Sequence, residues 1–377
     1  MSEQQIPVIV LAGFLGSGKT TLLNHLLRHS GDTRIGVIVN DFGAIEIDAM
    51  SVSGQVGSTV SLGNGCLCCA VDVSELDGHL EALTAPAARL DVIVIEASGL
   101  AEPQELVRMV LASDNRRVVY GGLVEVVDAA EFTATRERHP EVDRHLAMAD
   151  LIVLNKDDRV PETDRKALGD LLAELSPGTA VIAAEHGRVD PELLFACRPR
   201  DESAARQLTF EDLRAELGLD DEPPLEHLHA GYESLSFTAP TPLDPQRLMA
   251  FLDSRPTGLY RIKGFVDFGS GDPRNRYVLH AVGRFLRFYP EPWPSAAVRE
   301  TQLVLIGSGL DVPALRERLA ACGTEPAAQG RTDLALAEPD AVAEPAGPAG
   351  AAPPAVARSM WGVLRYVQHA EQEQDEE

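Results

Sequence analysis

The chain has 377 residues, more than one ordinary hydrophobic core accommodates, so we expect two domains with additional segments. Hydrophobic residues make up 45% of the sequence, and no apolar run approaches the roughly 20 residues that a membrane-spanning helix needs. The 58 acidic residues outnumber the 33 basic ones, and the formal net charge of −25 disfavours nucleic acid and anionic membrane surfaces as main partners.

The N-terminus and the cysteines indicate the compartment. Residues 1–5 are polar and lack the basic stretch of a signal peptide. The five cysteines are an odd number and three are crowded together, which is typical of metal or redox chemistry in a reducing compartment and not of a disulfide framework. We therefore expect a cytoplasmic protein.

The first predicted elements are a strand over residues 8–12, a glycine-rich G-x-x-x-x-G-K-T loop and a leucine-patterned helix that ends near residues 30–32. A phosphate-binding loop requires this order, because glycines let successive N–H groups turn toward an anion and the new helix directs its positive end at it. We expect Lys19 to reach the β- and γ-phosphates and the Thr20 hydroxyl to ligate Mg²⁺. The flanking strand and helix disfavour the alternative, a turn that binds nothing. The predicted nucleotide cradle comprises Gly13, Phe14, Leu15, Gly16, Ser17, Gly18, Lys19, Thr20 and Thr21.

A second strand is predicted over residues 35–39, and the polar segment that follows lies where a nucleotide hydrolase has a switch loop. Asp41 or Asp48 would then face the metal ion. The alternative, a solvated acidic loop, stays open for either residue.

Three cysteines, Cys66, Cys68 and Cys69, form a C-x-C-C motif after Gly-Asn-Gly. They cannot all enter a core from one face of a helix or strand, but on a loop they can converge on one ion. Soft thiolates suit Zn²⁺, Cu⁺ and similar metals, and three of them leave one tetrahedral position open, as a releasable site needs. The alternative, a structural cysteine in an apolar core, is the preferred interpretation for Cys197 and Cys322.

A helix over residues 73–83 and a nearly all-apolar strand over 90–96 follow, and the strand ends in Glu96. An acid there, close to a phosphate loop, is typical of a Walker-B residue, which holds the metal ion or orients the attacking water. Gly99 could offer its N–H to the γ-phosphate.

Strands over residues 118–127 and 151–154 precede an N-K-x-D pattern made by Asn155, Lys156 and Asp158. A carboxylate at Asp158 can accept from both N1–H and the exocyclic amine of guanine, a donor pair that adenine lacks, and the Lys156 stem can cover the base plane. Placed after a phosphate loop and an acid-terminated strand, this pattern indicates a P-loop GTPase. A helix over 168–175 and a strand over 179–183 come next.

We therefore predict an α/β P-loop NTPase domain with a mostly parallel sheet over residues 1–198, a polar linker over 199–230, a smaller α+β domain with a mostly antiparallel sheet over 231–323, and a disordered Ala/Pro-rich and acidic tail over 324–377. His227 and His229 in the linker could bind a metal, although such a surface pair more often binds nothing. Residues 360–367 have helical spacing and either dock on a partner, dock on the protein itself or fray. In the second domain, strands are predicted over 234–237, 259–266, 277–282, 285–288 and 302–306, and helices over 245–252 and 312–319.

The motifs G-F-L-G-S-G-K-T-T-L-L, N-G-C-L-C-C, I-E-A-S-G-L-A-E-P and L-N-K-D-D together resemble the CobW family of P-loop GTPases, over roughly residues 7–322. The resemblance implies GTP hydrolysis coupled to delivery of a metal, commonly Zn²⁺ and in some members Co²⁺, to a client protein. It implies that Cys66, Cys68 and Cys69 form the transferring site and that Thr20 ligates Mg²⁺. It also implies that Glu96 is the Walker-B acid and that the N-K-x-D residues read the base.

The chain departs from the family pattern in its switch, its linker and its tail. Family members often show E-F-G-E where this sequence has Asp41, Phe42, Gly43 and Ala44, so the second acid is missing. The short H-x-H pair argues against bulk metal storage, and the tail after residue 323 has no counterpart.

The expected protein is a Mg²⁺-dependent GTPase that binds GTP or GDP and transfers zinc, or cobalt, from the C-x-C-C motif to a client metalloprotein, with a homodimer as an open possibility. GTP binding would order the region between the switch and Glu96, and hydrolysis would relax it. The alternatives are a regulatory GTPase with a structural zinc site, cobalt delivery for cobalamin biosynthesis, and an ATP-using small-molecule kinase. A metal-sequestering binder is disfavoured by the intact Lys19, Thr20 and Glu96.

Overall fold

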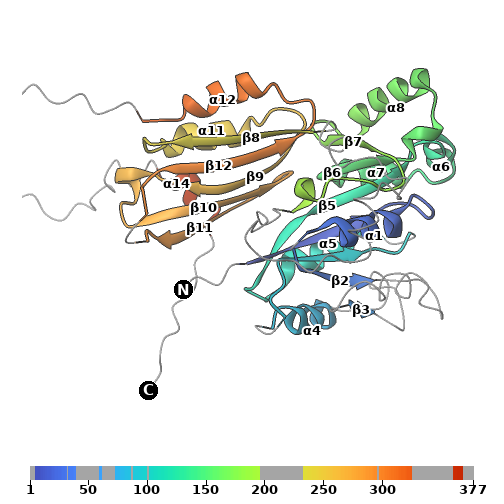
Figure 1. Ribbon diagram of the computed structural model, residues 1–377, viewed down its shortest axis with the longest axis horizontal. Helices are drawn as coiled ribbons and strands as arrows, with labels where there is room; N and C mark the ends of the chain where they lie inside the picture. Colours follow the sequence, from blue (N-terminus) through green and yellow to red (C-terminus); the bar gives the residue numbers. More distant parts are fainter. Residues whose placement is uncertain are drawn as a thin grey trace, which may run out of the picture.

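The computed structural model describes residues 5–31, 33–39, 59–61, 73–85, 88–99, 102–195, 232–294, 297–324 and 360–367. Figure 1 shows these residues as two parts side by side, each built on its own β-sheet. Within these ranges, the structure has no helix long and apolar enough to cross a membrane.

The first domain is built on a seven-stranded sheet in the order β3-β2-β4-β1-β5-β6-β7, and all six neighbouring pairs run parallel. Every residue of β2, β4 and β6 is buried, as expected for a parallel sheet covered on both faces. The predicted α/β fold with a mostly parallel sheet is confirmed. The strands are β1 (Ile6–Ala12), β2 (Ile35–Val39), β3 (Thr59–Ser61), β4 (Val92–Glu96), β5 (Val118–Asp128), β6 (Leu151–Asn155) and β7 (Ala180–Ala184).

Helices cover both faces of this sheet because successive strand residues point to opposite sides. Ile9 and Leu11 of β1 pack with the leucines of α1 in one core. Val8 and Val10 pack with α4 and α5 in another core. The helices are α1 (Lys19–His29), α4 (Val73–Leu83), α5 (Pro103–Ala112), α6 (Phe132–Arg138), α7 (Val142–Met148), α8 (Glu162–Leu175) and α9 (Pro191–Leu194), with a 3₁₀ turn η1 (Asp157–Arg159).

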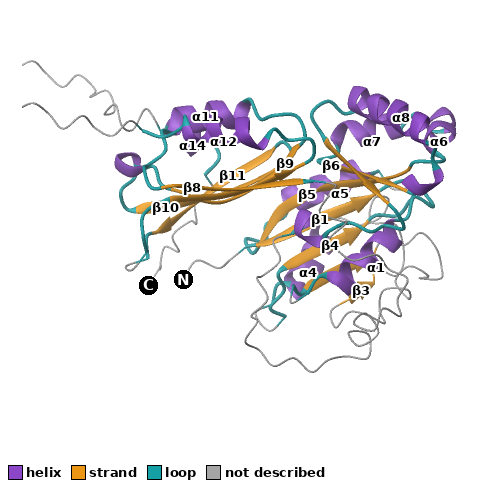
Figure 2. Cartoon of the chain, turned by 45° about the horizontal axis from the view of Figure 1, so that its top comes forward, coloured by secondary structure: helices purple, strands orange, loops and turns teal. Residues whose placement is uncertain are grey.

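The second domain is a five-stranded antiparallel sheet in the order β11-β10-β9-β12-β8. Figure 2 shows its helices gathered on one face of the sheet, where they enclose a second large core. All five predicted strands are confirmed, and β9 has the predicted bounds. The elements are β8 (Glu233–Ala239), α11 (Pro245–Asp253), β9 (Leu259–Val266), η3 (Gly269–Gly271), β10 (Asn275–Val282), β11 (Phe285–Pro292), β12 (Thr301–Gly307), α12 (Val312–Ala320) and α14 (Trp361–Leu364).

The structure differs from the sequence predictions in one strand, in several helices and in the tail. Strand β3 and helices α6, α7 and α9 were not predicted, and α8 begins at Glu162, six residues before the predicted start at residue 168. Part of the predicted disordered tail, residues 360–367, docks on the second domain. Met360 and Val363 are buried in its core, and Val367 pairs with Phe288 of β11. Of the three alternatives for this segment, docking on the protein itself is the one found.

Buried polar contacts join the two domains. Asp150, which directly precedes β6, accepts hydrogen bonds from the Tyr120 hydroxyl at 2.6 Å and from the Leu123 N–H at 2.9 Å. From the second domain, the His280 ring lies 3.0 Å from the Tyr120 carbonyl oxygen, and Arg261 donates to the Leu194 carbonyl oxygen at 2.9 Å. The hydrogen bonds of His280 and Arg261 cross between the domains, and the Arg284 N–H of the second domain likewise donates to Oδ1 of Asp150 at 3.4 Å.

Candidate functional site

The predicted phosphate loop connects the end of β1 to the start of α1. Gly13, Gly16 and Gly18 all have positive φ angles, of 144°, 78° and 104°. A Cβ at Gly18 would lie 2.3 Å from Nδ2 of Asn155, so the position requires glycine for its backbone angle and for its space. Gly18 also directly precedes α1, so the positive end of that helix dipole lies at the loop. The loop therefore has the shape and the field of an anion site.

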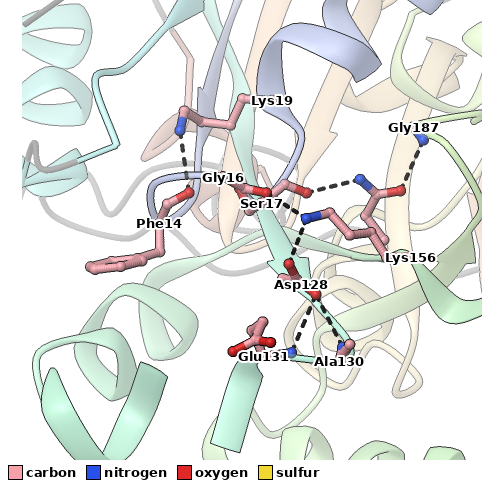
Figure 3. A network of polar contacts seen from close by, with 10 residues as sticks. Phe14, Gly16, Ser17, Lys19, Asp128, Ala130, Glu131, Lys156 and Gly187 are labelled. Atoms are coloured by element: carbon pink, nitrogen blue, oxygen red, sulfur yellow. Dashed lines mark hydrogen bonds and ion pairs between the residues drawn. The ribbon is translucent and has the colours of Figure 1, made fainter. Parts of the chain in front are cut away.

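Lys19 is folded back along the loop. Only 7% of the residue is exposed, and Nζ donates to the carbonyl oxygens of Gly13 at 2.9 Å and Phe14 at 3.4 Å; Figure 3 shows the contact with Phe14. Leu15, next in the loop, is 70% exposed, whereas Ser17 is buried. The ammonium group is thus held at the loop, where phosphate oxygens could replace its carbonyl partners.

Thr20 and Glu96 bring two oxygen atoms together beside Lys19. The Thr20 hydroxyl donates to Oε1 of Glu96 at 2.6 Å. Glu96 is 2% exposed and ends β4, which lies next to β1 in the sheet. A hydroxyl and a carboxylate are hard oxygen ligands of the kind that Mg²⁺ prefers, so this pair fits the predicted ion. Gly99 lies against the loop, since a Cβ there would be 2.8 Å from Cα of Leu15.

Two residues of the N-K-x-D pattern, Asn155 and Lys156, are hydrogen-bonded to the phosphate loop (Figure 3). Asn155 donates from Nδ2 to the Ser17 carbonyl oxygen at 2.8 Å and accepts from the Gly187 N–H through Oδ1, also at 2.8 Å. Lys156 donates from Nζ to the Gly16 carbonyl oxygen at 2.7 Å. Its φ angle of 61° is rare for a non-glycine residue, and such backbone strain is found mainly at functional sites. Hydrogen bonds therefore hold the predicted base-reading segment against the predicted phosphate loop.

Asp158 and its neighbour Asp157 have different environments. Asp157 is buried, and its Oδ1 forms an ion pair with Nε of Arg165 at 3.1 Å. Burial raises the pKa of Asp157 in spite of this arginine. Asp158 is exposed at the surface of η1. The Asp158 carboxylate is therefore accessible from solvent, and its contact with guanine stays a prediction. Thr21 is likewise exposed, on the first turn of α1.

Glu125, which lies in β5 beside the phosphate loop, is not among the site residues predicted from the sequence. Glu125 is 2% exposed, and Oε2 has no hydrogen-bond partner among the residues that the structure describes. Burial raises the pKa of this carboxyl to about 8, although Lys19 lowers it in part. The sequence offered one signal for Glu125, since it is the single acidic residue within the otherwise apolar run Val118–Val127. Asp128 was not predicted as a site residue either, and its Oδ2 accepts a hydrogen bond from Nζ of Lys156 at 2.6 Å.

Six of the predicted metal-site residues lie outside the described ranges. These residues are Asp41, Cys66, Cys68, Cys69, His227 and His229. Within the described ranges, no group of three or more His, Cys, Asp and Glu side chains could hold a metal ion. Cys322 is buried in the second core, as predicted for a structural cysteine. The arrangement of the C-x-C-C motif remains a prediction from sequence.

Two family models match the chain. Residues 7–183 match the nucleotide-binding domain of the CobW, HypB and UreG proteins, and residues 232–323 match the C-terminal domain of the cobalamin synthesis protein CobW. The two matched regions carry the two sheets described above.

Several relatives are similar over most of the chain. A zinc chaperone CobW from Sinorhizobium sp. is 32% identical over 359 residues, covering 85% of this chain and 98% of the relative. A zinc chaperone CobW from Pseudomonas aeruginosa is 32% identical over 358 residues, covering 84% of this chain and 91% of the relative. A crystal structure of Zn(II)-bound YjiA GTPase from E. coli is 22% identical and covers 85% of this chain and 100% of that chain, with a TM-score of 0.40. At that TM-score, the structural likeness supports no argument about function.

Proposed function

The chain belongs to the CobW family of nucleotide-binding proteins, and on this premise we propose that it is a GTPase that binds a transition metal and delivers it to a client protein. The observation that carries the GTPase part is the double hydrogen bonding of Asn155, which joins the phosphate loop at Ser17 to the loop at Gly187. The relatives named zinc chaperones support zinc as the metal, with cobalt as the second candidate.

The first domain would hold GTP at its phosphates and at its base. Lys19 and the backbone N–H groups of the loop bind the β- and γ-phosphates, and Thr20 and Glu96 hold Mg²⁺ through their oxygens. When bound, Mg²⁺ supplies positive charge that offsets the charge developing on the phosphate oxygens. Asp158 accepts from the guanine edge, and the Lys156 stem covers the base. Hydrolysis then depends on positioning and electrostatics, without a covalent intermediate.

Cys66, Cys68 and Cys69 are the proposed site of the cargo metal. His227 and His229 are secondary candidates for ligands of this metal, and Asp41 is a candidate contact to the metal ion at the nucleotide site. In the sequence, the three thiols lie between the proposed switch near Asp41 and the proposed Walker-B residue Glu96, and Gly99 follows. A change in the terminal phosphate of the nucleotide is therefore proposed to alter the affinity of the thiols for the metal, or the contact with the client. We place this activity in the cytoplasm, with a homodimer as one possible arrangement.

The test separates the nucleotide site from the metal site. The purified protein is assayed with GTP and with ATP, and bound zinc is measured with and without each nucleotide. We expect strong preference for GTP, zinc binding that depends on the nucleotide, and faster transfer of zinc to a chelating acceptor during hydrolysis. K19A should lose hydrolysis and keep zinc, whereas the triple variant C66S/C68S/C69S should lose zinc and still bind GTP.

Three outcomes contradict the proposal. Equal turnover of ATP would favour a small-molecule kinase. Unfolding on removal of zinc by a chelator would favour a regulatory GTPase with a structural zinc site. Equal affinity for zinc in the empty, GDP-bound and GTP-bound protein would contradict coupled delivery, and tighter binding of cobalt than of zinc would reassign the cargo.

A further inference from the structure

Glu125 places a carboxyl group next to the phosphate loop, inside an otherwise apolar strand. Its neighbours in the sheet are Ala12 of β1 and Ile152 of β6, and neither carries a polar side chain. Because Oε2 is buried without a partner among the described residues, an ionised Glu125 would be strongly destabilised at this place. A leucine or valine would fit the strand pattern better, so stability does not explain the carboxyl group.

The surroundings of Glu125 connect it to the loop. It lines a hollow of about 320 Å³ together with residues 14–17 of the phosphate loop, the end of β5 and helix α6. The charged groups on the walls of this hollow are Asp128, Glu131, Arg138 and Lys156. Nζ of Lys156 and Oδ2 of Asp128 form an ion pair at 2.6 Å, so their charges offset each other. Nε of Arg138 donates to a carbonyl oxygen of its own helix.

Lys19 is the cation whose field acts on Glu125. It reaches toward the loop from the start of α1, and the same ammonium group is proposed to bind the nucleotide phosphates. Glu125 and the phosphates therefore share one positive charge. An ionised Glu125 would compete with the phosphates for Lys19 and repel them through a medium of low dielectric constant, whereas a protonated Glu125 would do neither.

We propose that Glu125 is a positioning residue that supports the phosphate loop in its protonated form, and that nucleotide affinity falls when this proton is lost. The proposal rests on the proposed function, because it requires phosphates to bind beside Lys19. Burial raises the pKa of Glu125 to about 8 in the empty protein, so the carboxyl group keeps its proton below that pH. Bound phosphates offset the charge of Lys19, so they raise this pKa further. By linkage, nucleotide binding near pH 8 takes up a proton, and binding weakens as the pH rises above 8.

The first test measures the dissociation constant of Mg²⁺-GDP between pH 7 and pH 9 in the full chain. For the wild type we expect about tenfold weaker binding at pH 9 than at pH 7, since ionisation of one group opposes binding. E125Q, which imitates the protonated carboxyl, should lack this decline and bind about tenfold tighter than the wild type at pH 9. The matched control E131Q changes an exposed acid on the same hollow and should decline as the wild type does. Ionisation of guanine is common to all three proteins.

The second test needs no variant. Calorimetry of GDP binding at pH 8, in two buffers of different ionisation enthalpy, should show an uptake of about half a proton per nucleotide. Absence of uptake, or an equal decline in wild type and E125Q, overturns the role of Glu125 while leaving the GTPase proposal intact. Failure of the wild type to bind guanine nucleotides at pH 7 overturns the proposed function itself.

Discussion

The Thr20 hydroxyl donates a 2.6 Å hydrogen bond to Oε1 of Glu96, and this contact links the start of α1 to the end of β4. The two residues are far apart in the sequence, and the parallel order of β4 and β1 brings them together. The hydrogen bond keeps both oxygens beside the phosphate loop, in the place where a hydrolase needs its metal ion. The relationship leads directly to a test of Mg²⁺ dependence.

We expect T20A and E96Q each to lower GTP turnover by about 100-fold or more, because T20A removes one of the oxygens proposed to hold Mg²⁺ and E96Q neutralises the other. The measurement is GTP turnover as a function of Mg²⁺ concentration, and both variants should also need more Mg²⁺. T133A, which changes an exposed threonine of α6, is the matched control. A T20A protein with wild-type turnover and wild-type Mg²⁺ dependence would show that Thr20 is not a ligand.

Asp158 should determine the choice of base. D158N replaces an acceptor pair by a group that also donates, so we expect about 100-fold weaker binding of GTP and tighter binding of xanthosine triphosphate, which offers a carbonyl in place of the amine. The comparison variant D157N removes one of two carboxylate partners of Arg165, the other being Glu162. It should lower the melting temperature without changing the preference for the base. If D157N changed the preference between GTP and xanthosine triphosphate as much as D158N does, Asp158 would have no specific role in choosing the base.

Local chemistry made much of the site predictable from the sequence. The phosphate loop needs glycines and a lysine at fixed spacing, so Gly18 and Lys19 were identified before any fold was known. The apolar run of β5 predicted a strand correctly, but a run of apolar residues does not reveal what faces a single acid within it, and Glu125 was missed. Helix α6, with the sequence FTATRER, has too few apolar residues to show helical periodicity.

Long-range contacts explain the remaining differences. The helical spacing of residues 360–367 was visible in the sequence, yet its partner was not, because Val367 pairs with Phe288 of a strand that is distant along the chain. The contact between His280 and Tyr120 spans 160 positions and depends on how the two domains meet. No sequence pattern within either domain reports such a contact. The predicted thiol site lies outside the described residues and stays a prediction.

The docked segment should contribute to the stability of the second domain. Val363 is 0% exposed in the core of that domain, whereas Trp361, two residues earlier, is 57% exposed. We expect V363A to lower the free energy of unfolding by roughly 1–3 kcal/mol, through lost burial and a cavity, and W361A to change it by about 0.5 kcal/mol or less. Urea denaturation of the full-length variants measures both. A larger loss for W361A would mean that the exposed face of α14 is covered in solution.

The domain interface should weaken in acid because of His280. Burial, together with the positive charge of Arg261, lowers the pKa of His280 from 6.5 to about 3, so the folded protein keeps this ring neutral. The unfolded chain takes up the proton below pH 6.5, and the His280 contribution to stability is therefore present above pH 6.5 and lost as the pH falls toward 3. The expected loss is about 1.4 kcal/mol per pH unit within that window. In the folded state the neutral ring lies 3.0 Å from the Tyr120 carbonyl oxygen.

H280Q tests this prediction, since its amide can still donate to Tyr120 and does not titrate. Urea denaturation between pH 4.5 and 7 should show a steeper acid decline for the wild type than for H280Q, because only the wild type exchanges a proton at this position. H139Q is the matched control. The His139 ring is partly exposed and lies 3.0 Å from the Glu141 carboxylate, away from the domain interface. The acid decline of H139Q should have the same slope as that of the wild type. Parallel acid declines for the wild type and H280Q would mean that the ring takes up its proton without opening the interface. The charge of Arg261 would then have to be offset by another group.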